Sequence, residues 1–94
     1  MEGDFSIAWE ALRALRDRGV SPADVWEVLG SDRRLSRQVG AARAVVYGRA
    51  REGRWLAILV QEDSRCDGSW VVLAARELTA EEALQVRWLL GGAV

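Results

Sequence analysis

The chain has 94 residues, half of them hydrophobic and 29% charged, with a formal net charge of −1, the balance of one globular domain. It contains no histidine and no lysine, and its one cysteine is Cys66. Metal sites built on imidazole, zinc sites built on several cysteines and catalytic triads containing histidine are therefore excluded. Arginine stays protonated at working pH, so acid–base chemistry must use Asp, Glu, Tyr47 or Cys66. No cofactor is expected.

The sequence carries no sign of a membrane or of export. No stretch approaches the roughly 18 apolar residues that a membrane span needs. The acidic start at residues 1–4 lacks the basic region and apolar run of a signal peptide. Cys66 lies in a polar turn and is interpreted as an incidental thiol. We expect a cytoplasmic protein without membrane association.

The first predicted element is a helix over residues 5–18. Apolar residues recur there at intervals of three or four, the helical period, with a tryptophan beside them. These residues are Phe5, Ala8, Trp9, Leu12 and Leu15. Gly19 fits the position that ends a helix. A short strand over residues 5–7 leading into this helix is an alternative that the pattern leaves open.

A second helix is predicted after Ser21 and a proline, over residues 23–29. Serine is a favoured cap, proline is tolerated at the first helical position, and Asp24 suits the positive end of the helix. Gly30 ends the pattern. Residues 31–42 are polar, arginine-rich and weakly patterned, and they are predicted to form a loop.

Three strands are predicted next, over residues 43–49, 55–61 and 70–76. Short linkers join them, which favours hairpins and hence an antiparallel meander. The strands are apolar on both faces, whereas a sheet with one solvated face alternates more cleanly. Either a closing helix or another chain must cover part of the second face. We therefore predict a homodimer when no other partner is present.

The last predicted element is a helix over residues 79–90, opened by a capping box of Thr79 and Glu82. The fold class is then α+β. Two N-terminal helices precede a three-stranded antiparallel sheet and a C-terminal helix, in a single domain over residues 1–94.

Five tryptophans in so short a chain require an explanation. Trp9, Trp26 and Trp88 lie on predicted helices at positions that suit the core, and packing is the predicted role. Trp55 and Trp70 begin two strands that should pair. They are interpreted as a partner interface or as a surface on which a nucleobase stacks, and the doubly apolar sheet favours the interface.

Charge is distributed unevenly along the chain. Residues 33–54 hold seven arginines against one acid, a net charge of +6, whereas residues 1–32 and 55–94 carry −4 and −3. A basic middle between acidic ends is typical of a surface that binds a polyanion. A solvated, arginine-rich loop explains the same pattern, and the sequence does not separate the two.

Three stretches in register resemble the BrnT family of bacterial type II toxins, which have the RelE-like ribonuclease fold. In residues 16–29, a helix ends in a basic turn and Gly-Val-Ser leads into the second helix. Residues 48–56 carry the hairpin pattern Gly-Arg-x-x-x-Gly-Arg-x-Leu. In residues 75–82, a strand closes on Ala-Arg and a threonine-capped acidic helix follows. The family usually has Lys-His where this chain has Asp17 and Arg18.

The resemblance implies an mRNA-cleaving ribonuclease that a cognate antitoxin neutralises. Such an enzyme must hold a phosphate, move the proton of the 2′-hydroxyl and stabilise developing charge. The candidate catalytic residues are Arg49, Arg76 and Glu77, and the candidate RNA-binding residues are Arg43, Arg49, Arg51 and Arg54. Solvated arginines, or arginines paired with Glu52 and Glu77, are the competing structural explanation.

An alternative function is a non-catalytic module with the toxin fold that binds a protein partner or itself. The absence of lysine and histidine favours this alternative, because no strong general base is evident. Tyr47 shares a predicted strand face with Arg49, but a phenol alone is a weak base at neutral pH.

Overall fold

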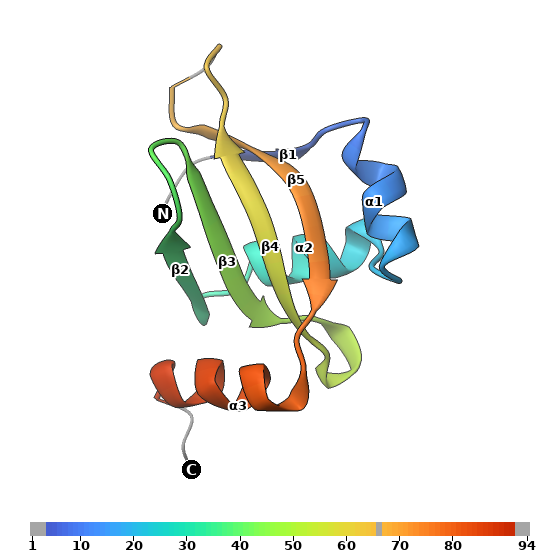
Figure 1. The fold of residues 1–94 in the computed structure, drawn as a ribbon, viewed down its shortest axis with the longest axis vertical. Coiled ribbons are helices and arrows are strands. Elements are labelled where there is room, and N and C mark those ends of the chain that lie inside the picture. The colour runs from blue at the N-terminus through green and yellow to red at the C-terminus, as the bar shows by residue number, and fades with distance from the viewer. Residues whose placement is uncertain (1–3, 66, 92–94) are drawn as a thin grey trace.

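A computed structural model describes residues 4–65 and 67–91, and Cys66 lies outside the described residues. A single five-stranded sheet organises this part of the chain (Figure 1). Its strands are β1 (Asp4–Ile7), β2 (Arg34–Gln38), β3 (Arg43–Arg49), β4 (Trp55–Glu62) and β5 (Ser69–Glu77). The helices are α1 (Ala11–Asp17), α2 (Pro22–Leu29) and α3 (Ala80–Leu89), with a 3-10 turn at Arg51–Gly53.

The strand order is β1-β5-β4-β3-β2. Strands β2 to β5 form an antiparallel meander, as the short linkers between the predicted strands require, while β1 pairs with β5 in parallel. The predicted α+β class and the three helices are confirmed. The predicted three-stranded sheet is wrong, because the described chain forms two further strands at its edges.

The first extra strand settles the alternative that the sequence left open at residues 5–7. Phe5 and Ile7 pack against the core while Ser6 is exposed, so this segment alternates with the period of a strand. The backbone N–H of Ala8 donates to the carbonyl of Val72 and extends the pairing. The first helix therefore begins only at Ala11, and its predicted start at residue 5 is wrong.

The second extra strand, β2, lies inside the predicted loop over residues 31–42. Its sequence, Arg-Leu-Ser-Arg-Gln, offers almost no apolar pattern, since an edge strand is largely exposed. Pairing with β3, from Arg34 opposite Gly48 to Gln38 opposite Ala44, supplies the backbone hydrogen bonds that make it a strand. The loop prediction failed because this pairing is tertiary and leaves no trace in local propensity.

The main core lies between one face of the sheet and α1 and α2. Val46, Ile58 and Val72, from three neighbouring strands, are completely buried there. Val28 of α2 packs so closely on β3 that a Cβ at Gly48 would lie 2.8 Å from its Cγ1. The predicted start of α2 is confirmed, because Ser21 and Asp24 form a reciprocal capping box.

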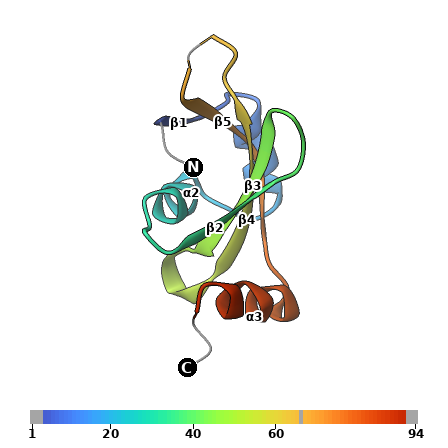
Figure 2. The ribbon, with the colours of Figure 1, turned by 90° about the vertical axis from the view of Figure 1, so that its left-hand side faces the viewer.

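The opposite face of the sheet is only partly covered. Helix α3 follows β5 through the capping box of Thr79 and lies across one end of the strands (Figure 2). It packs against the sheet in a second, smaller cluster around Ala57, Leu78 and Val86, with Tyr47 and Trp55 half-buried at its edge. Toward the other end of β3 and β4, Val45 and Leu59 stay half-exposed. We call this side the open face.

Side chains do not alternate regularly along β5. A register shift between Leu59 and Val60 places Val72 opposite Val60 and Ala74 opposite Leu59. Val72 and Ala75 therefore both point into the main core. Strict alternation along a strand would place these two residues on opposite faces, but a bulge that adds one residue to the strand brings them to the same face.

The three tryptophans that were predicted to lie on helices are not core residues. Trp9, Trp26 and Trp88 are 82%, 45% and 70% exposed, so their predicted packing role is wrong. Trp9 precedes the shortened α1. Trp88 lies two residues, about 200° around the helix, from the buried Val86 and so points outward.

Candidate functional site

The turn between β3 and β4 places two arginines at the same end of the sheet. Arg49 ends β3 and points to the open face, whereas Arg54 precedes β4 and points to the face covered by α1 and α2. The chain reverses through Glu52 and Gly53, whose φ angles of 61° and 74° lie in the left-handed region. A Cβ at Gly53 would lie 3.5 Å from Nη2 of Arg49, so this guanidinium rests against the turn.

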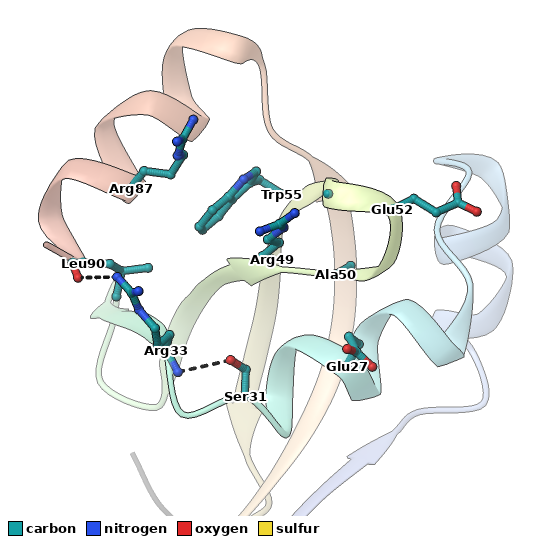
Figure 3. Close-up of a pocket in the computed structure, with 10 residues that line it drawn as sticks. Glu27, Ser31, Arg33, Arg49, Ala50, Glu52, Trp55, Arg87 and Leu90 are labelled. Carbon is teal, nitrogen blue, oxygen red and sulfur yellow. Dashed lines mark hydrogen bonds between the residues drawn. The ribbon is translucent and has the colours of Figure 1, made fainter. Parts of the chain in front are cut away.

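Beside this turn, at the end of the sheet, lies a groove of about 570 Å³. The end of α3 lines one side of it, and α2 with the segment before β2 lines another. Three arginines from three separate segments, Arg33, Arg49 and Arg87, line the groove together with Trp55. Figure 3 shows the Trp55 ring between Arg49 and Arg87, while the carboxylate of Glu52 points away from the other lining side chains.

The three groove arginines differ in how far they are engaged. Arg33 donates from Nη2 to the carbonyl oxygen of Leu90 at 2.8 Å, which ties β2 to the end of α3. Within residues 4–65 and 67–91, Arg49 and Arg87 make no hydrogen bond and no ion pair. Both are exposed. Two acids, Glu27 and Glu52, also line the groove, and Glu52 points away from the arginines. Three arginines against two acids leave a net positive charge, which favours an anionic ligand.

A second cluster lies further along the open face. Arg76 forms a two-pronged ion pair with Glu82, with both N–O distances 2.8 Å. This hydrogen bond from Arg76, followed by one from the backbone of Thr79, lowers the pKa of Glu82 to about 2. The hydrogen bond to Glu82 raises the pKa of Arg76, and the nearby Tyr47 adds a smaller contribution. Glu82 is thus held ionised and is a weak base.

Arg54 has a structural role on the other face. Its Nε lies 3.2 Å from Oε1 of Glu77, its Nη1 lies 3.3 Å from Oδ2 of Asp24, and its Nη2 donates to the carbonyl of Gly19 at 3.0 Å. The pKa of Asp24 is lowered first by the backbone hydrogen bond from Ser21 and to a smaller extent by Arg54. Arg54 therefore joins the sheet to the turn between α1 and α2.

The structure separates the candidate catalytic residues. Arg49 and Arg76 share the open face, whereas Glu77 lies on the opposite face and is paired with Arg54. We leave Glu77 out of the site, since a base must reach the proton that it removes.

The candidate RNA-binding arginines are also dispersed. Arg43 donates to Gln61 at 3.0 Å and lies six residues from Arg49, about 20 Å along an extended strand. Arg51 lies in the exposed 3-10 turn and is close enough to Asp24 to lower its pKa slightly. Of the four candidates, only Arg49 lines the groove.

Sequence reasoning missed Arg33 and Arg87 as groove residues. Arg33 belongs to the basic segment, but the predicted loop gave it no defined position. Arg87 lies in the last turn of α3, where a basic residue is ordinary helix chemistry. The packing of α3 beside the turn brings Arg87 to the groove, and the segment between α2 and β2 brings Arg33.

The two tryptophans predicted to form one interface lie on opposite faces. Trp55 packs against the small cluster under α3 and reaches the groove, whereas Trp70 packs against the main core beside Phe5. Both are half-buried. They cannot belong to one flat patch.

Two further observations concern residues 4–65 and 67–91. This part of the chain holds no group of three or more carboxylate or cysteine ligands arranged to bind a metal ion. None of its helices is both long and apolar enough to cross a membrane.

Comparison with known proteins identifies the fold. Neither protein-family models nor curated proteins match the chain. Among solved structures, the ribonuclease toxin BrnT of Brucella abortus superposes with a TM-score of 0.59 and 14% sequence identity, over 84% of this chain and 97% of that chain. The resemblance inferred from the sequence is therefore confirmed for the fold.

Proposed function

We propose that this protein is the toxin of a BrnT-like toxin–antitoxin pair, acts on mRNA as a ribonuclease and is neutralised by a cognate antitoxin. The fold, which is that of a ribonuclease toxin, supports the proposal, and so does the arginine-lined groove between α2 and α3. The single observation that carries the RNA part is the pair Arg49 and Arg87, two exposed guanidiniums without a described partner beside an aromatic ring. Arginine suits this role because its fork donates two hydrogen bonds to one phosphate.

In the proposed reaction, Arg49 holds the phosphate next to the bond that breaks and stabilises the charge that develops on it. Arg76 lies on the same face but is neutralised by Glu82, so it serves the reaction only if that pair opens. Tyr47, beside Arg76, is the open-face group with a proton to give to the leaving oxygen. Glu82 is a weak base, so a water molecule takes the 2′-hydroxyl proton as the 2′-oxygen attacks the phosphate. The tyrosine, which has given its proton to the leaving oxygen, regains one from water.

A second candidate function is a non-catalytic module that binds a protein partner or itself. One specific observation favours it. Leu84, Trp88 and Leu89 of α3 are 65%, 70% and 66% exposed and form an apolar outer surface on that helix. Aromatic residues of this kind dominate the energetics of protein interfaces. The same surface would also serve an antitoxin, so the two functions differ in catalysis rather than in partner binding.

Induction in bacterial cells separates the two candidates. Wild-type protein should arrest growth and shorten mRNA lifetimes, and Arg49→Ala should abolish both effects. Arg43→Ala, at the far end of the same strand, is the matched control and should behave as wild type. Growth arrest without RNA decay would support the binding module and overturn the ribonuclease proposal.

A further inference from the structure

The groove contains an aromatic ring that phosphate binding alone does not explain. Trp55 opens β4 with one side against the cluster under α3, and its remaining surface reaches the groove. Arg49 comes from the same hairpin, Arg87 from the last turn of α3, and Arg33 from the segment before β2. Elements distant in sequence thus place two cations beside one half-buried indole, with a third, Arg33, bound to the end of α3.

No arginine is stacked on this ring. On the other face of the sheet, by contrast, the guanidinium of Arg34 lies over the ring of Phe5, 5.7 Å from its centre. Arg49 rests against the backbone of Gly53 instead. In Figure 3, Arg49 and Arg87 flank Trp55 from two different elements. The indole is thus available to a planar ligand, with an unpaired cation on each side.

The chemistry of such a ligand follows from the groove. A nucleobase stacks on an indole. The two phosphates that flank its nucleotide in the RNA chain carry the negative charges that an arginine on each side binds. The groove is open to solvent on one side, and its volume of about 570 Å³ leaves room for one nucleotide. A base within a duplex cannot reach the ring, because its faces are covered by its neighbours.

We propose that the groove is a subsite for one unpaired nucleotide of single-stranded RNA. The base stacks on Trp55, and Arg49 and Arg87 hold the flanking phosphates. Arg33 positions the end of α3 through its hydrogen bond to Leu90. The inference rests on the proposed action on RNA and narrows the substrate to single strands. Trp55 then acts as a binding residue, whereas Trp70 is a core residue.

The test measures the affinity of the full chain for a fluorescent single-stranded RNA of about ten nucleotides, the matched duplex and an acidic peptide of similar charge. Wild type should bind the single strand more tightly than the other two probes. Trp55→Leu should weaken single-strand binding by about 5- to 100-fold, the range for one base stacked on an aromatic ring, and Trp55→Phe should retain most of the affinity. Trp88→Leu, an exposed position next to Arg87, is the matched control and should bind as wild type.

Two measurements protect the test against misfolding, because Trp55 also packs under α3. Arg87→Gln changes an exposed side chain and should weaken binding with an unchanged melting temperature. An RNA with an abasic site at the stacked position should bind weakly to wild type. Trp55→Leu should bind the abasic RNA and the intact RNA with equal affinity, because this variant has already lost the stacking interaction.

Three outcomes would overturn the subsite: equal binding of single strand and duplex, equal binding of the acidic peptide, or unchanged affinity in Trp55→Leu. The proposed function fails separately. Growth arrest and RNA decay that persist in Trp55→Leu would refute the subsite and leave the ribonuclease intact. Trp55-dependent binding without RNA decay in cells would support the subsite and refute the ribonuclease.

Discussion

Arg49 and Arg54 flank the same turn, and their surroundings are opposite. Arg54 faces the helices and is engaged by Glu77, Asp24 and the carbonyl of Gly19. Arg49 faces the open side and has no partner within residues 4–65 and 67–91. The two residues are both arginines and lie five positions apart, so the difference in their hydrogen bonding arises from what packs on each face of the sheet. An arginine with all its partners supplied by the fold is structural, and an arginine without them is a candidate for ligand binding.

The same contrast extends across the sheet. On the helix-covered face, Val46 and Ile58 are completely buried. On the open face, Val45 and Leu59, their neighbours in the chain, are half-exposed. Stability should therefore depend mainly on one face and function on the other.

The largest expected effect tests this division with two adjacent residues. Ile58→Ala removes a fully buried side chain and should lower the free energy of unfolding by about 3 kcal/mol, because a cavity remains. Leu59→Ala, on the open face, should cost about 1 kcal/mol or less. Urea denaturation of both variants measures the difference. Equal losses would mean that the open face is as well packed as the core.

The next effect contrasts the two arginines. Arg54→Ala should lower the free energy of unfolding by about 1–2 kcal/mol, because the substitution leaves Asp24 without its ion-pair partner and the Gly19 carbonyl without a donor. The lost pair with Glu77 adds little, because Glu77 is partly exposed to solvent. Arg49→Ala should change stability by less than about 0.5 kcal/mol. Thermal melts give both values. A marked loss in Arg49→Ala would assign that residue a structural role.

A smaller effect should appear in the dependence of stability on pH. The pKa of Glu82 is lowered to about 2 in the folded state from an ordinary value of 4.5. The stabilisation from its pair with Arg76 is therefore present above pH 4.5 and lost as pH falls toward 2. Glu82→Gln should flatten the melting-temperature profile in this window. Glu81→Gln is the control, and a profile that Glu82→Gln leaves unchanged would contradict the strength of the pair.

Local sequence signals predicted much of this fold. The bounds of β3 agree with the predicted residues 43–49, Ser21 caps α2 as predicted, and the predicted capping box of Thr79 and Glu82 forms. Each depends on residues close in sequence. The polar strand β2 was not predictable, because backbone pairing with β3 makes it a strand and its own sequence has no apolar pattern. The register shift at Leu59 was equally invisible.

The candidate site was predictable only in part. Arg49 was identified from the hairpin motif and does line the groove. Glu77 was grouped with Arg76 because they are adjacent, yet adjacent residues of a strand point to opposite faces. The position of Arg87 in the groove depends on how α3 packs against the turn, and no pattern in the local sequence predicts that packing.

RNA affinity as a function of salt concentration tests the central claim most directly, that the unpartnered arginines of the open face bind RNA. For single-stranded RNA, Arg49→Gln should weaken binding and lower the magnitude of the slope of log affinity against log salt by about 1, because one phosphate contact is lost. Arg43→Gln, with its arginine about 20 Å away along β3, should leave the slope as in wild type. Equal slopes for wild type and Arg49→Gln, or equal losses in both variants, would contradict the account.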